Sequence, residues 1–438
     1  MYISKIKKII TDNELTSSDN LLNFLQDNWG KLSESELRSI AEYANANRQK
    51  NSAYYTDNFI INDMVNSLPI VDKDEIRILE PSVGIGNFVM PLIKRFASRF
   101  KKITIDLNDL DPESLQLAKF FLSKQHIPKN IAIQYSHFNF LNSFVFCNTK
   151  YDYVIGNPPF KRITAKQSAK LGNTITNLSG QFLLKAMSIS NIVSLVMPKN
   201  LLSTNDYKDL RQLAQKKPID TIIDFGEKGF KGVLIETIAI TIGAGNRGKT
   251  NVRSYIDGTN RSVSESYITS SEFPTWLLYR DKQFDDVAKH MEFNIFSVFR
   301  DRQITNAKLQ DSGPIKVYKS QNIKKDGGGL KDIPGYNKFM SLDTSKPLSV
   351  MKYYNNTDVY LVPNMTYYPR MIKKSDKYIV NGSIAILELK QGEALTEKQR
   401  LFFASDKFRR FYLIARNKGT RSLNIDKVSV FWFGRYKE

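Results

Sequence analysis

The first residues whose types and spacing suggest chemistry are Asn157, Pro158, Pro159 and Phe160, which follow the apolar run 151–156. The Asn157 amide oxygen and the Pro158 carbonyl are both hydrogen-bond acceptors, and the prolines lock φ, so the carbonyl direction is fixed. Two rigid acceptors suit an amino group with two hydrogens. When the two oxygens accept both N–H bonds of the amino group, its nitrogen becomes a better nucleophile, and no general base is needed. Phe160 offers a face for a planar base; the alternative is a proline-stabilised turn with no chemical role.

The second feature is a glycine-bearing turn, in which Glu80 ends the run 76–80 and Gly84 and Gly86 precede an apolar helix. In a parallel sheet this turn lies where ligands bind, and glycines let the backbone approach a ligand closely. A dinucleotide fingerprint would place glycine or alanine at the position of Val89. An adenosyl group with a cationic amino-acid tail therefore fits better than a pyrophosphate. The alternative is an ordinary tight turn.

Acidic residues follow the next strand-like run, 102–107. A carboxylate at this position can accept hydrogen bonds from a ribose diol, and Asp109 is the first choice, with Asp111 the next. The alternative is that these acids cap the helix that follows. The glycine turn and the acids together favour a nucleoside ligand.

The elements that position these residues form a βα pattern. Short β-branched runs alternate with helical segments, which predicts an α/β fold around a mostly parallel sheet; the runs are 76–80, 102–107, 131–135, 151–156, 192–197, 219–225 and 237–242. Residues 13–49 predict two helices ahead of this fold. The glycine-rich segment 243–251 predicts a domain boundary. Beyond it, residues 396–419 predict an amphipathic helix that buries Leu401, Phe402, Phe408 and Tyr412.

Composition narrows the class of protein. Lys and Arg number 64 against 44 Asp and Glu, a net charge of +20, which favours a polyanionic partner, although lysine-rich surfaces also occur without function. Residues 251–438 carry 32 basic and 20 acidic side chains, so the second part is the more basic. Cys147 is alone and the three histidines are scattered, which predicts no disulfide and no metal site. With no long apolar run and no export signal, we expect a cytoplasmic protein.

In this order, these motifs resemble the S-adenosylmethionine-dependent DNA adenine-N6 methyltransferases of the gamma arrangement, such as methylases of restriction-modification systems. The resemblance implies a Rossmann-like methyltransferase domain over 51–245, a helical extension over 1–50, and a second α/β domain over 246–438 that recognises DNA. It implies S-adenosylmethionine as cofactor. The cofactor site that it implies consists of Tyr54, Tyr55, Thr56, Glu80, Pro81, Gly84, Gly86, Asp109, Leu110, Asn139 and Phe140.

The chain departs from the family pattern at three positions, of which one, Asn139, belongs to this implied site. Ser52 and Asp57 replace the usual glycine and proline around "AYYT", and Asn139 stands where the family has aspartate. An amide oxygen can still accept a hydrogen bond from the cofactor's adenine, so we expect weaker binding at most. The resemblance also places Phe230 where an aromatic ring would stack on the target base, opposite Phe160.

The function that the resemblance implies is methyl transfer to the N6 amino group of an adenine flipped out of duplex DNA, with Asn157, Pro158, Pro159 and Phe160 as the catalytic residues. Expected partners are double-stranded DNA and a separately encoded restriction endonuclease, and we expect a monomer. Candidate DNA contacts are Arg300, Arg302, Arg370, Lys373 and Arg421. Three alternatives stay open: an RNA adenine methyltransferase, a protein glutamine methyltransferase and a DNA-specificity module with a degenerate methylase fold.

Overall fold

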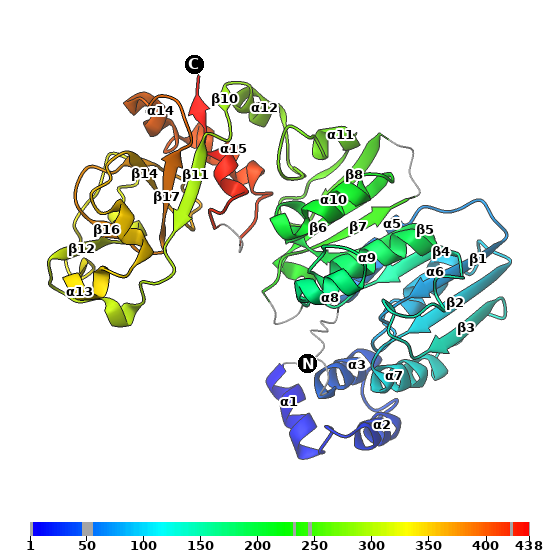
Figure 1. The fold of residues 1–438 in the computed structure, drawn as a ribbon. Helices are drawn as coiled ribbons and strands as arrows, with labels where there is room; N and C mark the ends of the chain where they lie inside the picture. Colours follow the sequence, from blue (N-terminus) through cyan, green and yellow to red (C-terminus); the bar gives the residue numbers. More distant parts are fainter. Residues whose placement is uncertain (1–2, 46–55, 231–233, 244–247, 421–423, 438) are drawn as a thin grey trace. The chain divides into compact units, whose positions relative to one another are not determined.

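The computed structural model describes residues 3–45, 56–230, 234–243, 248–420 and 424–437. The chain divides into two compact units, Met1–Ser266 and Tyr267–Glu438 (Figure 1). The boundary expected at residue 246 therefore lies later, because β8 (Lys249–Ser254) pairs in parallel with β6 (Ile219–Gly226) and β9 (Asn260–Ser264) pairs with β8. Both strands continue the sheet of the first unit.

The first unit begins with α1 (Ile3–Asp12), α2 (Ser18–Asp27) and α3 (Glu34–Ala44), one helix more than the sequence predicts. A capping box between Ser33 and Glu36 starts α3. The buried faces of these helices share a core cluster with Leu117 and Phe121 of α7 (Pro112–Ser123). The extension is thus packed onto the α/β fold.

A nine-stranded sheet forms the centre of this unit, in the order β3-β2-β1-β4-β5-β7-β6-β8-β9. Its other strands are β1 (Glu75–Glu80), β2 (Lys102–Asn108), β3 (Ile131–Ser136), β4 (Tyr151–Gly156), β5 (Ser190–Pro198) and β7 (Thr237–Ile242). All seven predicted runs are strands. Strand β7 is antiparallel to β5 and β6, and β9 to β8; the remaining pairs are parallel.

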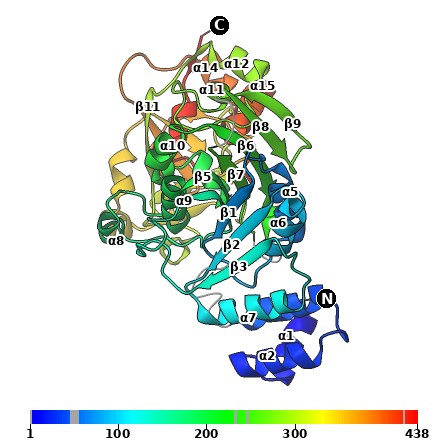
Figure 2. The ribbon, with the colours of Figure 1, turned by 90° about the vertical axis from the view of Figure 1, so that its right-hand side faces the viewer.

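Helices cover both faces of the sheet. Figure 2 shows α9 (Leu178–Ile189) and α10 (Lys208–Ala214) on one side and α5 (Asn58–Ser67) and α6 (Val89–Phe96) on the other. The central strands are buried on both faces, and Ile78, Ile105 and Tyr153 are fully inaccessible. The chain runs outward from β1 to β3 and then returns to β4 beside β1. Ligands of open α/β sheets bind at such a reversal, outside the carboxyl ends of the strands.

The second unit contains smaller sheets, with strand orders β11-β17-β14-β15, β13-β12-β16 and β10-β18. The strands are β10 (Met291–Glu292), β11 (Phe296–Arg300), β12 (Ile315–Tyr318), β13 (Lys338–Met340), β14 (Val359–Pro363), β15 (Ile372–Lys373), β16 (Ile379–Val380), β17 (Ile384–Leu389) and β18 (Arg435–Tyr436). The other α-helices among the described residues are α8 (Ala165–Lys170), α11 (Glu265–Ile268), α12 (Lys282–Ala288), α13 (Leu342–Ser345), α14 (Glu397–Phe402) and α15 (Asp406–Ala415). Single 3₁₀ turns lie at Lys199–Leu202, Asn205–Tyr207, Glu227–Gly229, Asn306–Lys308, Ser320–Asn322, Ser349–Tyr353 and Ser429–Trp432.

The single helix expected over 396–419 is two helices, α14 and α15. Ser405 ends the run because its hydroxyl accepts the Phe408 N–H and so caps a new helix. The break rotates the first helix, which leaves Leu401 exposed and Phe402 half-buried, while Phe408 and Tyr412 are buried as predicted. None of the described helices is long and apolar enough to cross a membrane.

Candidate active site

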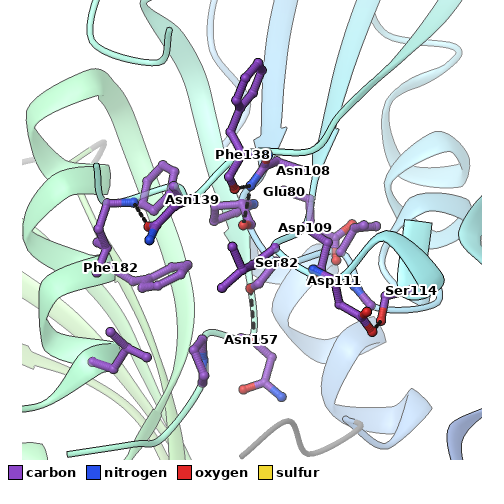
Figure 3. A pocket seen from close by; sticks show the side chains of 18 of the residues that line it. Glu80, Ser82, Asn108, Asp109, Asp111, Ser114, Phe138, Asn139, Asn157 and Phe182 are labelled. Carbon is purple, nitrogen blue, oxygen red and sulfur yellow. Dashed lines mark hydrogen bonds between the residues drawn. The ribbon is translucent and has the colours of Figure 1, made fainter. Parts of the chain in front are cut away.

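A cavity of about 620 Å³ lies at the carboxyl ends of β1, β2 and β4. The loops after β1, β2, β3 and β4 line it, together with residues of α8 and α9 and with Asn45 and Thr56. Figure 3 shows labelled side chains from the loops after β1, β2, β3 and β4 and from α9 around one hollow. The predicted cofactor residues Thr56, Glu80, Pro81, Gly84, Asp109, Leu110, Asn139 and Phe140 all line it. Tyr54 and Tyr55 lie outside the described residues.

Glu80 is the most deeply buried acid of the cavity. Its side chain is 1% exposed, and its Oε2 has no hydrogen-bond partner in the described part of the chain. Burial raises the pKa of this carboxyl well above its usual range, and the neighbouring Asp109 raises it further. Such a buried oxygen calls for a hydrogen-bond partner, which a ligand or a water molecule in the cavity can supply.

The glycine turn after β1 depends on left-handed backbone. Gly84 has φ of +56° and Gly86 has φ of +82°, a region that other residues rarely adopt. Gly86 does not line the cavity; a Cβ there would make an ordinary contact, 3.6 Å from Cβ of Ala118, so its left-handed backbone and not its packing favours glycine. The backbone N–H of Gly84 donates to Oδ2 of Asp109 at 2.8 Å, which ties the β1 turn to the β2 loop.

The two candidate ribose acids have different roles. Asp109 accepts the N–H groups of Gly84 and Asp111, and burial raises its pKa to about 6 although these backbone bonds lower it. Asp111 accepts from the Ser114 hydroxyl at 2.8 Å and from the Asn45 amide at 3.0 Å. Asp111 therefore anchors the start of α7 and the end of α3, and Asp109 is the better placed acceptor for a ligand.

Asn108 is a site-forming residue that the sequence reasoning missed. It is fully buried, and its amide donates to the carbonyls of Pro81 and Phe138, both at 3.1 Å. Its oxygen accepts the Phe138 N–H at 3.1 Å and the Ser136 hydroxyl at 3.0 Å. One side chain thus joins the ends of β1, β2 and β3 (Figure 3). The available signal was a polar residue at the end of an apolar run.

Asn139 and Phe140, in the loop after β3, have unequal environments. Asn139 is exposed, and its Oδ1 accepts the Leu141 N–H at 3.1 Å. An amide oxygen has a second lone pair, so a ligand's amino group can still donate to it. Phe140 is buried, with its ring 5.0 Å from that of Phe182, measured between ring centroids. Phe182, which the sequence reasoning did not single out, also lines the cavity.

The Asn-Pro-Pro-Phe turn meets the same cavity through Asn157 and Pro159. The Asn157 carbonyl accepts the Ser82 hydroxyl at 3.1 Å, which holds the turn against the β1 loop (Figure 3). Pro158 and Phe160 are not among the lining residues. The Phe160 ring meets that of Phe230 edge-on, with 5.7 Å between centroids and 67° between planes. A base between them, as the sequence predicts, would require the rings to separate and become parallel.

Asp57, a departure from the family pattern, has a local explanation. Its side chain accepts the Phe59 N–H at 3.3 Å and caps α5. Aspartate is a favourable residue for this position. The preceding Thr56 is buried, lines the cavity and forms a β-bridge with Phe230. The substitution therefore serves the helix and leaves Thr56 at the site.

The candidate DNA contacts of the second unit differ in exposure. Arg302 and Lys373 are exposed, and the Lys373 ammonium forms an ion pair with Asp358 at 3.5 Å. Arg300 is half-buried, and its guanidinium donates to the side-chain oxygen of Asn364 at 3.4 Å. Arg370 is 9% exposed, which leaves little of its guanidinium accessible for the expected DNA contact. Its guanidinium donates to the carbonyls of Ser320, Ile323 and Tyr368, which binds two loops together. Arg421 lies outside the described residues.

Comparison with known proteins places the site in context. Residues 92–230 match the family model described as Eco57I restriction-modification methylase. A comparison with curated protein sequences found no match. With the sheet order, the family match confirms the expected Rossmann-like methyltransferase fold of the first unit.

Solved structures that resemble the chain include the methyltransferase subunit of a type I restriction-modification system from Streptococcus thermophilus. It is 16% identical, with a TM-score of 0.40, over 52% of this chain and 54% of that one. The type IIL restriction-modification enzyme MmeI, solved with DNA, is 12% identical, with a TM-score of 0.49, over 98% of this chain and 67% of that one. The chain spans about half the length of the type I subunits that it matches.

Proposed function

We propose that this protein transfers a methyl group from S-adenosylmethionine to the N6 amino group of adenine in DNA. The observation that carries the proposal is that Asn157, at the end of β4, lines the same cavity as Glu80 and Asp109, at the ends of β1 and β2. The proposed amino-group acceptor and the proposed nucleoside site thus line one cavity. The methylase family match over residues 92–230 supports methyl transfer to DNA.

The residues present fit the cofactor. The unsatisfied, buried Oε2 of Glu80 suits the donors of a cationic amino-acid tail, and Asp109 suits a ribose diol. Leu110 and Phe140 line the cavity beside these acids and offer apolar surface to an adenine ring. When bound, S-adenosylmethionine supplies an electrophilic methyl group on a sulfonium.

The chain's own residues would prepare the target nitrogen. The Asn157 side-chain oxygen and the Pro158 carbonyl accept its two N–H bonds, which keeps electron density on nitrogen and orients its lone pair. No shifted general base is required before attack. Phe160 would stack on the target base once its ring leaves the edge-on contact with Phe230. The basic second unit would hold the duplex while the base is flipped, which costs a few kcal/mol.

The test is Asn157→Ala. Loss of one preorganised transition-state contact typically lowers the rate about 10²–10³-fold, so methyl transfer to DNA should fall at least that far while cofactor affinity stays unchanged. Adenine modification is read by sequencing DNA from a host that lacks adenine methylation, and cofactor affinity by calorimetry. Asn191→Ala, an exposed asparagine at the start of β5, is the matched control. Full methylation by Asn157→Ala would refute the mechanism.

One observation favours a second candidate, a DNA-specificity module without activity. The Oδ1 of Asn139 is already engaged by Leu141, and the residue lacks the second carboxylate oxygen that the family offers the cofactor. Calorimetry with the wild-type protein separates the two. Measurable S-adenosylmethionine binding supports the enzyme, and DNA binding with no cofactor affinity supports the module.

A further inference from the structure

The polypeptide around Asn157 has an unusual charge distribution. From Tyr153 to Asn205 the sequence contains no aspartate or glutamate. The same stretch supplies one side of the cavity through the Asn157 turn, α8 and α9. It contains six basic residues, Lys161, Arg162, Lys166, Lys170, Lys185 and Lys199.

The fold uses three of these six. Arg162 forms an ion pair with Asp206. The Lys185 ammonium donates to the carbonyls of Phe140 and Ser143, at 2.5 Å and 2.9 Å, and holds the loop after β3. Lys199 is buried and pairs with Asp224 at 2.8 Å. All three positive charges therefore interact with groups of the protein itself.

The other three, Lys161, Lys166 and Lys170, are exposed, and none forms an ion pair within the residues that the structure describes. Lys161 and Lys170 line the cavity. Lys166 precedes Lys170 by four residues in α8, so the two lie on the same helical face. We call these three residues the lysine triad. It concentrates uncompensated positive charge at the side of the cavity where Asn157 lies.

The segment that bears the triad is held in place by its own hydrogen bonds. A capping box between Thr164 and Gln167 starts α8. The Lys161 carbonyl accepts the Leu178 N–H at 2.8 Å, and the buried Ser168 hydroxyl donates to the Asn173 carbonyl at 2.8 Å. The lysines therefore project from a fixed backbone rather than a loose loop.

We propose that the lysine triad binds the phosphates of a nucleic-acid strand on either side of the nucleotide whose base enters the cavity. This inference rests on the proposed function and names the substrate class of the same site. A base brings an anionic phosphate on each side, whereas a glutamine side chain brings none. Uncompensated cations beside Asn157 thus select nucleic acid over protein as the methyl acceptor.

The experiment compares the wild type with the triple variant Lys161→Gln, Lys166→Gln, Lys170→Gln. Duplex DNA affinity is measured across a series of salt concentrations. Each lost phosphate contact removes about 0.9 from the slope of log affinity against log salt. We expect the slope to become shallower by about 2 to 3 and affinity near 0.15 M salt to fall roughly tenfold or more. Cofactor affinity should change less than about twofold, because the triad is assigned to the acceptor strand.

Two further variants control for net charge and for folding. Lys7→Gln, Lys8→Gln, Lys31→Gln removes three exposed lysines, two in α1 and one between α2 and α3, and should leave the slope within about 1 of the wild type. Lys161→Arg, Lys166→Arg, Lys170→Arg keeps the charge and should restore binding. Because the arginine variant fills the same positions, its recovery excludes misfolding as the cause.

The outcomes separate this inference from the proposed function. A wild-type protein that neither binds nor methylates DNA overturns both. A wild type that methylates DNA, together with a glutamine triple variant of unchanged slope, overturns only the inference. Equal losses of cofactor and DNA affinity would place the lysines in the cofactor site and also overturn it. Arginine rescue with the predicted change in slope supports it.

Discussion

At the scale of single residues, similar side chains have different roles because their surroundings differ. Asp109 and Asp111 are two residues apart, yet Asp109 contacts the glycine turn while Asp111 joins two helices. Arg302 and Arg370 both belong to a basic unit, but only Arg302 is exposed. Residue type therefore indicates which chemistry is available, and burial determines whether a ligand can use it.

The environment of Asp109 predicts a pH dependence of cofactor binding. Burial raises its pKa to about 6, so at pH 5.5 most free protein carries a proton on this carboxyl. A ribose diol needs the ionised acceptor, so binding expels the proton, and affinity should rise from pH 5.5 to 7.5. Calorimetry at these pH values measures it. In Asp109→Asn, the cofactor should bind more weakly by about 1.5–3 kcal/mol. The part of the pH dependence that is due to the Asp109 carboxyl should also disappear. Equal affinity of the wild type at both pH values would contradict the assignment.

Arg370 predicts a stability effect instead of a DNA effect. Arg370→Ala removes the donors to the Ser320, Ile323 and Tyr368 carbonyls, so we expect a loss of about 2–4 kcal/mol in the free energy of unfolding. Arg302→Ala, at an exposed position, should change it by less than about 0.5 kcal/mol. Urea unfolding of both variants measures the difference. Indistinguishable midpoints would show that the guanidinium is not structural.

At the scale of elements, the turn after β1 and the end of β2 form the site together. Gly84 adopts a left-handed backbone, donates to Asp109 and lines the cavity. Asn108 then fixes the ends of three neighbouring strands. The ligand side of the sheet is therefore set by polar contacts between loops, above a core that is apolar.

Two glycines test the turn against a matched control. Gly84→Ala and Gly30→Ala both place a Cβ on left-handed backbone, with φ of +56° and +83°, so each should cost about 1–2 kcal/mol of stability. Only Gly84 lines the cavity, and a Cβ at Gly30 would meet nothing within 4 Å. Cofactor affinity should therefore fall in Gly84→Ala alone. A parallel loss in both variants would mean that stability, not the turn, controls binding.

At the scale of the whole molecule, the chain consists of two units with separate cores. The sheet of the first unit includes β8 and β9, so its natural end is residue 266. The second unit, from residue 267, carries much of the excess positive charge. The proposed methyl-transfer site thus belongs to the first unit, and most of the excess positive charge belongs to the second.

Truncation tests this division. A fragment of residues 1–266 should unfold cooperatively and bind the cofactor within about threefold of the full chain, while duplex DNA affinity should fall at least about tenfold as the basic unit is lost. A fragment ending at residue 245 lacks β8 and β9 and exposes the edge of β6, so it should be less stable and aggregate more readily. Equal stability of the two fragments, by thermal unfolding, would contradict the boundary.

The sequence alone determined the features that depend on local backbone and periodicity. The seven β-branched runs, the glycine-bearing turn after β1 and the proline-fixed segment after β4 were visible because strand period and the backbone properties of glycine and proline are local. The tertiary structure decided what depends on distant contacts. Strand pairing determined where the first unit ends, folding buried Arg370, and the positions of carboxylates determined that Lys199 forms an internal ion pair. Burial and charge pairing arise only between segments far apart in the chain, so no short motif records them.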